Sequence, residues 1–183
     1  LLRDLPIVRP NQVWQIDITY IKTSFGVLYL TCIIDVFSRR IMGWELSIFL
    51  DTGSCLRALS MALKIAKPDI LNSDQGSQFT SDAWIKALFA NQIRVSMDGK
   101  GRWADNVFIE RFWRTLKQEA LPFRSYSTIN ELRFYLQGFI EFYNTKRCHQ
   151  SLSYKTPNSV YDLVDIAAQV DLSIINREVP MNS

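Results

Sequence analysis

Histidine and cysteine are scarce in this chain of 183 residues, which has one histidine, His149, and three cysteines, Cys32, Cys55 and Cys148. A single histidine excludes a histidine-rich metal site and argues against a serine-histidine-aspartate triad. Because the cysteines are odd in number and unrelated in spacing, they predict neither a disulfide framework nor a zinc site. We therefore expect free thiols, as in a reducing cytoplasm.

Long apolar runs are also missing. The longest, "GVLYLTCII" at residues 26–34, is far too short to span a bilayer, and no secretory signal pattern is visible. We expect a soluble, intracellular protein with no membrane partner. With 48% hydrophobic and 13% aromatic residues, the chain can bury one good core, which predicts a single compact domain.

A strong excess of either charge is absent as well. The net charge of +3 and the pI near 8.8 do not by themselves indicate a nucleic-acid partner. Cations are nevertheless concentrated between residues 94 and 117, where six Lys or Arg face only three acids. This segment is the candidate surface for an anionic ligand.

Hydrophobic periodicity predicts the element order βββαβαβαα, which belongs to an α/β fold with a mixed five-stranded sheet flanked by helices. Three strands in an antiparallel meander come first, and later strands alternate with capped helices. We expect a linker at residues 1–12, one folded core at residues 13–163 and a tail at residues 164–183. The expected strands are residues 13–21, 27–36, 40–49, 69–73 and 93–97, and the expected helices begin near residues 52, 81, 105, 128 and 156. The helix that begins near residue 105 is expected to run to about residue 120.

Three carboxylates occupy positions that such a sheet can bring together. Asp17 lies in the middle of the first strand, Asp74 at the carboxyl end of the fourth, and Glu110 in the helix after the fifth. Carboxylates beside the central strands cost free energy, and close like charges raise each other's pKa. A divalent cation removes both costs, and hard oxygen ligands suit Mg²⁺ or Mn²⁺. Two such ions about 4 Å apart promote in-line displacement at phosphorus.

Each acid also has a simpler interpretation. Asp17 can be a solvated strand residue, Asp74 can close an Asx turn before Gly76, and Glu110 can pair with Arg114 at i+4. Asp35, at the end of the second strand, is a fourth candidate acid, for which we prefer a structural hydrogen-bonding role.

Five stretches of the sequence resemble one known family. They are "WQIDITYI", "IIDVFSRRIMGW", "ILNSDQGSQFTS", "DNVFIERFWRTLKQE" and "FYNTKRCHQSLSYKTP". Together they are similar to the retroviral-integrase-like core of bacterial insertion-sequence transposases, in the group whose enzyme is encoded by the second of two overlapping frames. The 35 residues between Asp74 and Glu110, and the lysine seven positions after the glutamate, match this family's Asp-Asp-Glu pattern.

The resemblance implies a ribonuclease-H-like fold, Asp17, Asp74 and Glu110 as metal-binding catalytic residues, and two Mg²⁺ or Mn²⁺ ions when DNA is bound. It also implies DNA as substrate, homo-oligomers that join two element ends, and a helix-turn-helix region that this chain lacks. The activity expected is cleavage of the phosphodiester at the element's end, followed by strand transfer.

Candidate DNA contacts lie on and before the helix that carries Glu110. On a regular α-helix, Asn106, Glu110, Arg114 and Lys117 fall within one stripe. Lys100 and Arg102 belong to the glycine-containing loop at residues 98–103, which we expect to change shape around DNA.

Two other functions use the same sequence features. A decayed element can leave a non-catalytic DNA-binding or assembly remnant, although all three acids are intact. A ribonuclease-H-like nuclease would use the same ions on a different duplex, which the context of Lys117 argues against.

Overall fold

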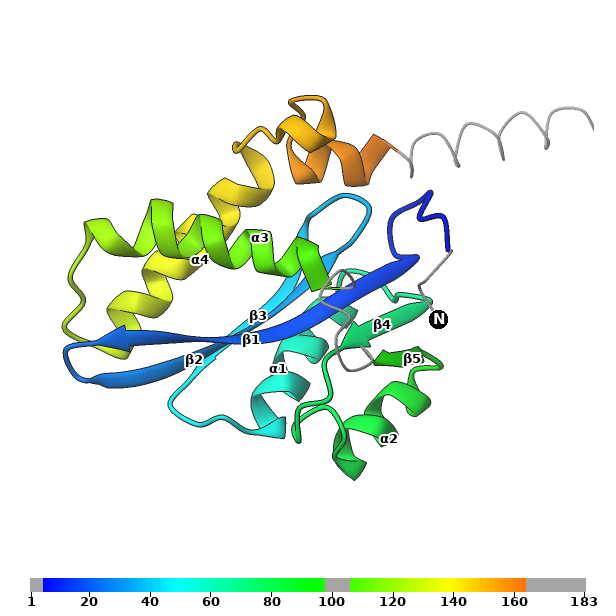
Figure 1. Cartoon of the computed structure of the whole chain (residues 1–183), viewed down its shortest axis with the longest axis horizontal. Coiled ribbons are helices and arrows are strands. Elements are labelled where there is room, and N and C mark those ends of the chain that lie inside the picture. The colour runs from blue at the N-terminus through cyan, green and yellow to red at the C-terminus, as the bar shows by residue number, and fades with distance from the viewer. Residues whose placement is uncertain (1–4, 98–105, 164–183) are drawn as a thin grey trace, which may run out of the picture.

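One mixed sheet of five strands organises the computed structural model, which describes residues 5–97 and 106–163 (Figure 1). The strand order is β3-β2-β1-β4-β5, with β1, β2 and β3 antiparallel and β4 and β5 parallel to β1. The predicted mixed five-stranded sheet is therefore confirmed. The strands are β1 (Val13–Thr23), β2 (Gly26–Asp35), β3 (Ile41–Ser47), β4 (Ile70–Ser73) and β5 (Arg94–Met97).

Helices cover both faces of this sheet (Figure 1). On one face, α1 (Thr52–Leu63) and α2 (Asp82–Ala90) bury a cluster around Trp14 and Trp84. On the other face, α3 (Val107–Thr115) and α4 (Ile129–Thr145) bury a second cluster around Phe112. The all-apolar β2 contributes side chains to both clusters, as expected for a strand covered on both faces. Residues 157–163 are also helical.

Four of the five predicted helix starts are confirmed by capping hydrogen bonds, whereas α3 begins at Val107 without one. The side chains of Asp51 and Ser81 accept bonds from the backbone N–H groups three residues later, at the starts of α1 and α2. Thr128 does the same for α4, and Thr156 for the helix at residues 157–163. In the described residues no helix is both long enough and apolar enough to cross a membrane.

The helix that carries Glu110 differs from the prediction at its carboxyl end. We expected one α-helix to about residue 120, whereas α3 ends at Thr115 and a π-helical turn, η2 (Leu116–Ala120), follows. A short 3-10 turn, η3 (Leu121–Phe123), comes next and contains Pro122, which cannot continue an α-helical hydrogen-bond ladder. Lys117 therefore belongs to the wider turn.

β1 has one open side for most of its length. β2 pairs with β1 over its whole length, but β4 pairs only with residues Val13, Trp14 and Gln15. Among the described residues, the edge of β1 from Ile16 onward has no other strand beside it. This edge begins where Asp17 is located.

Candidate active site

Asp17 is the best-constrained of the three predicted carboxylates. It lies on β1, is half-buried, and its Oδ2 accepts a 2.8 Å hydrogen bond from Nε1 of Trp113 on α3. Burial is the main cause that raises the pKa of Asp17 to about 6, and the hydrogen bond from Trp113 acts in the opposite direction. The alternative of a fully solvated strand residue does not hold.

Asp74 follows β4 directly and is exposed. Its Oδ1 accepts a 2.9 Å hydrogen bond from the backbone N–H of Gly76, so the Asx turn considered above is formed. A Cβ atom at position 76 would lie 3.0 Å from that same oxygen and 2.9 Å from Oε1 of Gln78, so a larger residue would crowd the turn. The turn occupies Oδ1, and the structure gives Oδ2 no hydrogen-bond partner among the described residues.

Glu110 is exposed in the first turn of α3. Two contacts hold α3 against β1: the backbone N–H of Ile109 donates to Oε1 of Gln15 at 3.3 Å, and Trp113 donates to Asp17. Glu110 forms no ion pair in the described part of the chain, so the alternative pairing with Arg114 is not present.

The three acids influence one another electrostatically. The negative charges of Asp74 and Glu110 both contribute to the raised pKa of Asp17, after burial. Within residues 5–97 and 106–163, however, no three acidic, thiol or imidazole side chains lie close enough to hold a metal ion together. The fold thus brings the carboxylates to one region without converging them on one point.

This donor set fits Mg²⁺ or Mn²⁺. It consists of carboxylate oxygens alone, the ligands that these hard cations prefer, and in the described residues no Lys or Arg neutralises it by an ion pair. Asp74 and Glu110 are exposed, so neighbouring side chains do not hold their carboxylates in a single rotamer by burial.

Asp35 has the structural role that we preferred for it. It is fully buried, and its carboxylate accepts hydrogen bonds from the backbone N–H of Asn11 and from the N–H and hydroxyl of Ser38. These bonds fix the turn between β2 and β3 and the chain that enters β1.

The candidate DNA contacts differ in exposure. Arg114 and Lys117 are exposed, whereas Asn106 is buried at the start of α3 and makes no capping bond. The regular stripe predicted from sequence is therefore broken at both ends, by the burial of Asn106 and by the π-helical turn at Lys117. Lys100 and Arg102, with the loop at residues 98–103, lie outside the described residues.

Sequence reasoning missed two aromatic partners of these residues. Trp113 is buried in the core, and its indole N–H also donates to Asp17. Nζ of Lys117 lies 4.8 Å from the centre of the Tyr20 ring, a cation–π contact. The i+3 spacing from Glu110 to Trp113 is the one sequence signal that could have placed the indole beside the acids.

Comparison with known proteins identifies the family. The integrase core domain matches residues 8–102, and a second family of the same description matches residues 91–157. The transposase for insertion sequence element IS904 of Lactococcus lactis subsp. lactis (strain IL1403) is 40% identical over 152 residues, 81% of this chain and 60% of that protein. The transposase InsF for insertion sequence IS3A of Escherichia coli (strain K12) is 35% identical over 144 residues, 76% of this chain and 50% of that protein.

Among solved structures, the HTLV-2 integrase catalytic core domain in complex with magnesium superposes with a TM-score of 0.64 at 20% identity, covering 84% of this chain and 98% of that one. This likeness confirms the predicted ribonuclease-H-like fold. The chain covers 60% and 50% of the lengths of the two transposases. From its matched domains and its sequence relatives, the chain belongs to the integrase core domain family, as a core of the insertion-sequence transposase type.

Proposed function

We propose that this chain is the catalytic core of a transposase that cleaves a phosphodiester bond at each end of an insertion sequence and then transfers the freed 3′-hydroxyl to target DNA. Asp17, Asp74 and Glu110 are its metal ligands, and the complex with DNA holds two Mg²⁺ or Mn²⁺ ions. The enzyme acts as a homo-oligomer on DNA in the bacterial cytoplasm, at the nucleoid.

The observation that carries this proposal is the electrostatic state of Asp17. A half-buried carboxylate, with a pKa raised to about 6 and with two further acids acting on it, is an unfavourable arrangement in the free protein. Carboxylates whose pKa is perturbed by burial and by neighbouring charges are typical of functional sites. A divalent cation would reverse the penalty, because it favours the ionised form of all three acids.

The chain's own residues have separable parts in the reaction. When bound, divalent cations of this class activate the attacking oxygen and stabilise the charge that develops on the leaving oxygen. Trp113 fixes one oxygen of Asp17, which orients the other. The Asx turn at Gly76 fixes Asp74 at the end of β4, and Gln15 fixes the start of α3 and thus Glu110.

An exposed aromatic face supports self-association. On α4, Phe134 and Phe142 are 79% and 45% exposed, and they lie eight residues apart, which places them on the same side of the helix. A second copy of this chain would remove that surface from water. Two element ends must be held together during transposition, which requires more than one catalytic core.

The proposal is tested with purified protein and three duplexes, each with Mg²⁺ or Mn²⁺. They are an oligonucleotide that carries the element end found from the inverted repeats flanking the coding sequence, a scrambled duplex and an RNA–DNA hybrid. We expect cleavage of the element end alone, and its loss in Asp74→Asn and Glu110→Gln. Preferential cleavage of the hybrid would instead identify a ribonuclease-H-like nuclease. Cleavage by Asp74→Asn at the wild-type rate would overturn the site assignment.

A further inference from the structure

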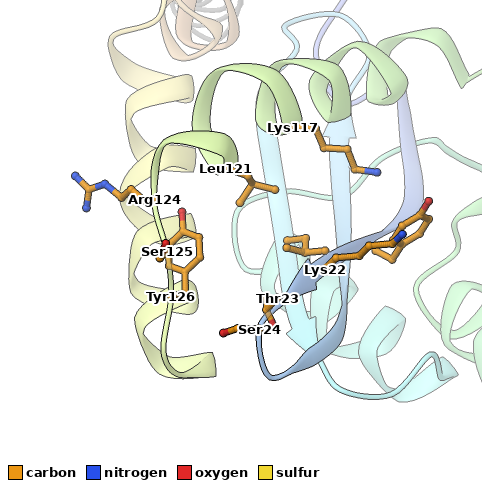
Figure 2. A pocket seen from close by; sticks show the side chains of 10 residues that line it. Lys22, Thr23, Ser24, Lys117, Leu121, Arg124, Ser125 and Tyr126 are labelled. Carbon is orange, nitrogen blue, oxygen red and sulfur yellow. The ribbon is translucent and has the colours of Figure 1, made fainter.

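A cavity of about 540 Å³ opens at the far end of β1 from Asp17. Its walls come from two segments: the end of β1 with the turn into β2, and the chain from η2 to the start of α4 (Figure 2). The polar side chains that line it include Tyr20, Lys22, Ser24, Lys117 and Ser125.

The charge of this cavity has one sign. Its described lining contains Lys22, Lys117 and Arg124 and no acidic residue. Within the described part of the chain, none of these three cations forms an ion pair. Figure 2 shows Lys22 and Lys117 extending toward the same side of the cavity, whereas Arg124 points away from it. Two cations without an ion pair among the described residues therefore line the same cavity, one from β1 and one from η2.

Tyr20 contacts one of these two cations and precedes the other by two positions on β1. Tyr20 and Lys22 are two positions apart on β1 and so share a side of the strand. Nζ of Lys117 lies 4.8 Å from the centre of the Tyr20 ring. The contact holds Lys117 over β1 and leaves its N–H groups available. A phosphate group is the anion that two ammonium groups and neighbouring hydroxyls recognise in this way.

The distance from the acids defines which phosphate would lie here. Lys22 follows Asp17 by five positions on β1, so a rise of about 3.3 Å per residue separates their Cα atoms by about 17 Å along the strand, and the odd spacing directs the two side chains to opposite sides of it. One strand of duplex DNA advances about 3.4 Å per nucleotide. A DNA strand that follows the open edge of β1 would therefore place a phosphate about five nucleotides from the reaction centre at this cavity. The open edge of β1 runs between the two points, and its backbone N–H groups can also contact a DNA strand.

We propose that Lys22, Lys117 and Tyr20 form a phosphate-binding site for the backbone of the DNA substrate, about five nucleotides from the bond that is cut. The inference rests on the proposed function, since it takes DNA as the ligand, and adds Lys22 and Tyr20 to it. The site holds the strand along β1 and so fixes the position of the scissile phosphate relative to the acids. It reads the backbone and not the base sequence.

The test measures binding of a fluorescent element-end duplex between about 50 and 200 mM salt, in an Asp74→Asn background that does not cut. Lys22→Ala should weaken binding about three- to tenfold and lower the salt slope by about one unit. The double variant, Lys22→Ala with Lys117→Ala, should lower the salt slope by about two units. Lys64→Ala is the matched control, because Lys64 is an exposed lysine at the end of α1 on the opposite face, and it should change neither quantity.

Neutral methylphosphonate linkages locate the contact. A neutral linkage about five nucleotides from the cleavage site should abolish the difference between Lys22→Ala and its parent, while linkages elsewhere should preserve it. Two outcomes would overturn the phosphate site: an unchanged salt slope in Lys22→Ala, or a contact that maps to another phosphate. If the wild-type chain still cuts DNA, the proposed function is unaffected by either outcome. Absence of cleavage by the wild-type chain, with intact DNA binding and the expected Lys22 effect, would overturn only the proposed function.

Discussion

Nε1 of Trp113 donates a 2.8 Å hydrogen bond to Oδ2 of Asp17, and this bond connects α3 to the central strand β1. It stabilises the ionised carboxylate against the effect of burial, which has the larger influence on the pKa of Asp17. The same bond fixes the orientation of the carboxylate, which also accepts a backbone hydrogen bond at Ile18, and leaves lone pairs for a cation. Trp113 is thus a positioning residue for the proposed metal site.

Trp113→Phe should keep most of the packing and lose this bond. The pKa of Asp17 would then rise further, because a hydrogen bond to the charged form is removed, and Mn²⁺-dependent cleavage should fall about 10- to 100-fold at neutral pH. The acidic limb of the pH–rate profile should move to higher pH.

Trp84→Phe is the matched control for that change. Trp84 is equally a core tryptophan, it lies on the other face of the sheet, and its Nε1 has no hydrogen-bond partner in the described structure. It should alter stability slightly and leave the pH profile in place. The same profile for the wild-type chain and Trp113→Phe would mean that Trp113 has only a packing role.

Asp17 itself should make the stability of the metal-free chain depend on pH. Its folded-state pKa of about 6 is above the value of about 3.9 for an unfolded chain, so its favourable contribution is complete below about pH 4 and is lost as the pH rises through 6. Asp17→Asn should therefore be more stable than wild type at pH 7 without metal, by roughly 1 to 3 kcal/mol, and this difference should vanish near pH 4.

Thermal melts in EDTA across this pH range measure the difference. Adding Mn²⁺ supplies the second comparison: it should raise the melting temperature of the wild-type chain at pH 7 and leave that of Asp17→Asn unchanged. If the difference in stability between Asp17→Asn and the wild-type chain in EDTA were the same at pH 4 and pH 7, the raised pKa of Asp17 would be contradicted.

Much of this arrangement could be predicted from the sequence. The alternating β1, the apolar β2 and the capping residues of α1, α2 and α4 are local signals, and they gave the correct element order and approximate bounds. The spacing of Asp74 and Glu110 matches a family pattern in which one acid follows the fourth strand and the other lies in the helix after the fifth. In the topology of that family these two positions are close together. The structure agrees, through the effect of both acids on Asp17.

Other features depend on contacts between elements that are distant in sequence. The bond from Trp113 to Asp17 spans 96 positions, and the contact of Lys117 with Tyr20 requires α3 and η2 to lie along β1. The π-helical turn at Leu116–Ala120 changes the direction in which Lys117 points. The 3.6-residue period of a regular α-helix, from which the stripe was predicted, does not apply in such a turn. Such features require the tertiary structure.

Asp35 provides a test that separates a structural acid from a catalytic one. Its buried carboxylate accepts three hydrogen bonds, from Asn11 and Ser38, so Asp35→Ala leaves three donors unpaired in the core. We expect a loss of about 2 to 4 kcal/mol in the free energy of unfolding, measured by urea denaturation. At a temperature where the variant is folded, Mn²⁺ should still stabilise it, unlike Asp17→Asn. Loss of the Mn²⁺ effect in folded Asp35→Ala would instead make Asp35 part of the metal site.

The exposed aromatic face of α4 predicts where copies of the chain meet. Phe134 is 79% exposed, and a cavity of about 550 Å³ beside it is lined largely by aromatic side chains. Burying such a ring against a second copy contributes about 1.5 to 3 kcal/mol, and Phe134→Glu would place a charge in that interface instead. Sedimentation velocity should show a dimer for wild type and a weaker or absent dimer for Phe134→Glu.

Phe89→Glu is the matched control, because Phe89 is 77% exposed on α2 at the opposite face of the sheet and should leave the dimer intact. If the Phe89 change dissociates the dimer and the Phe134 change does not, the interface belongs to the α2 face.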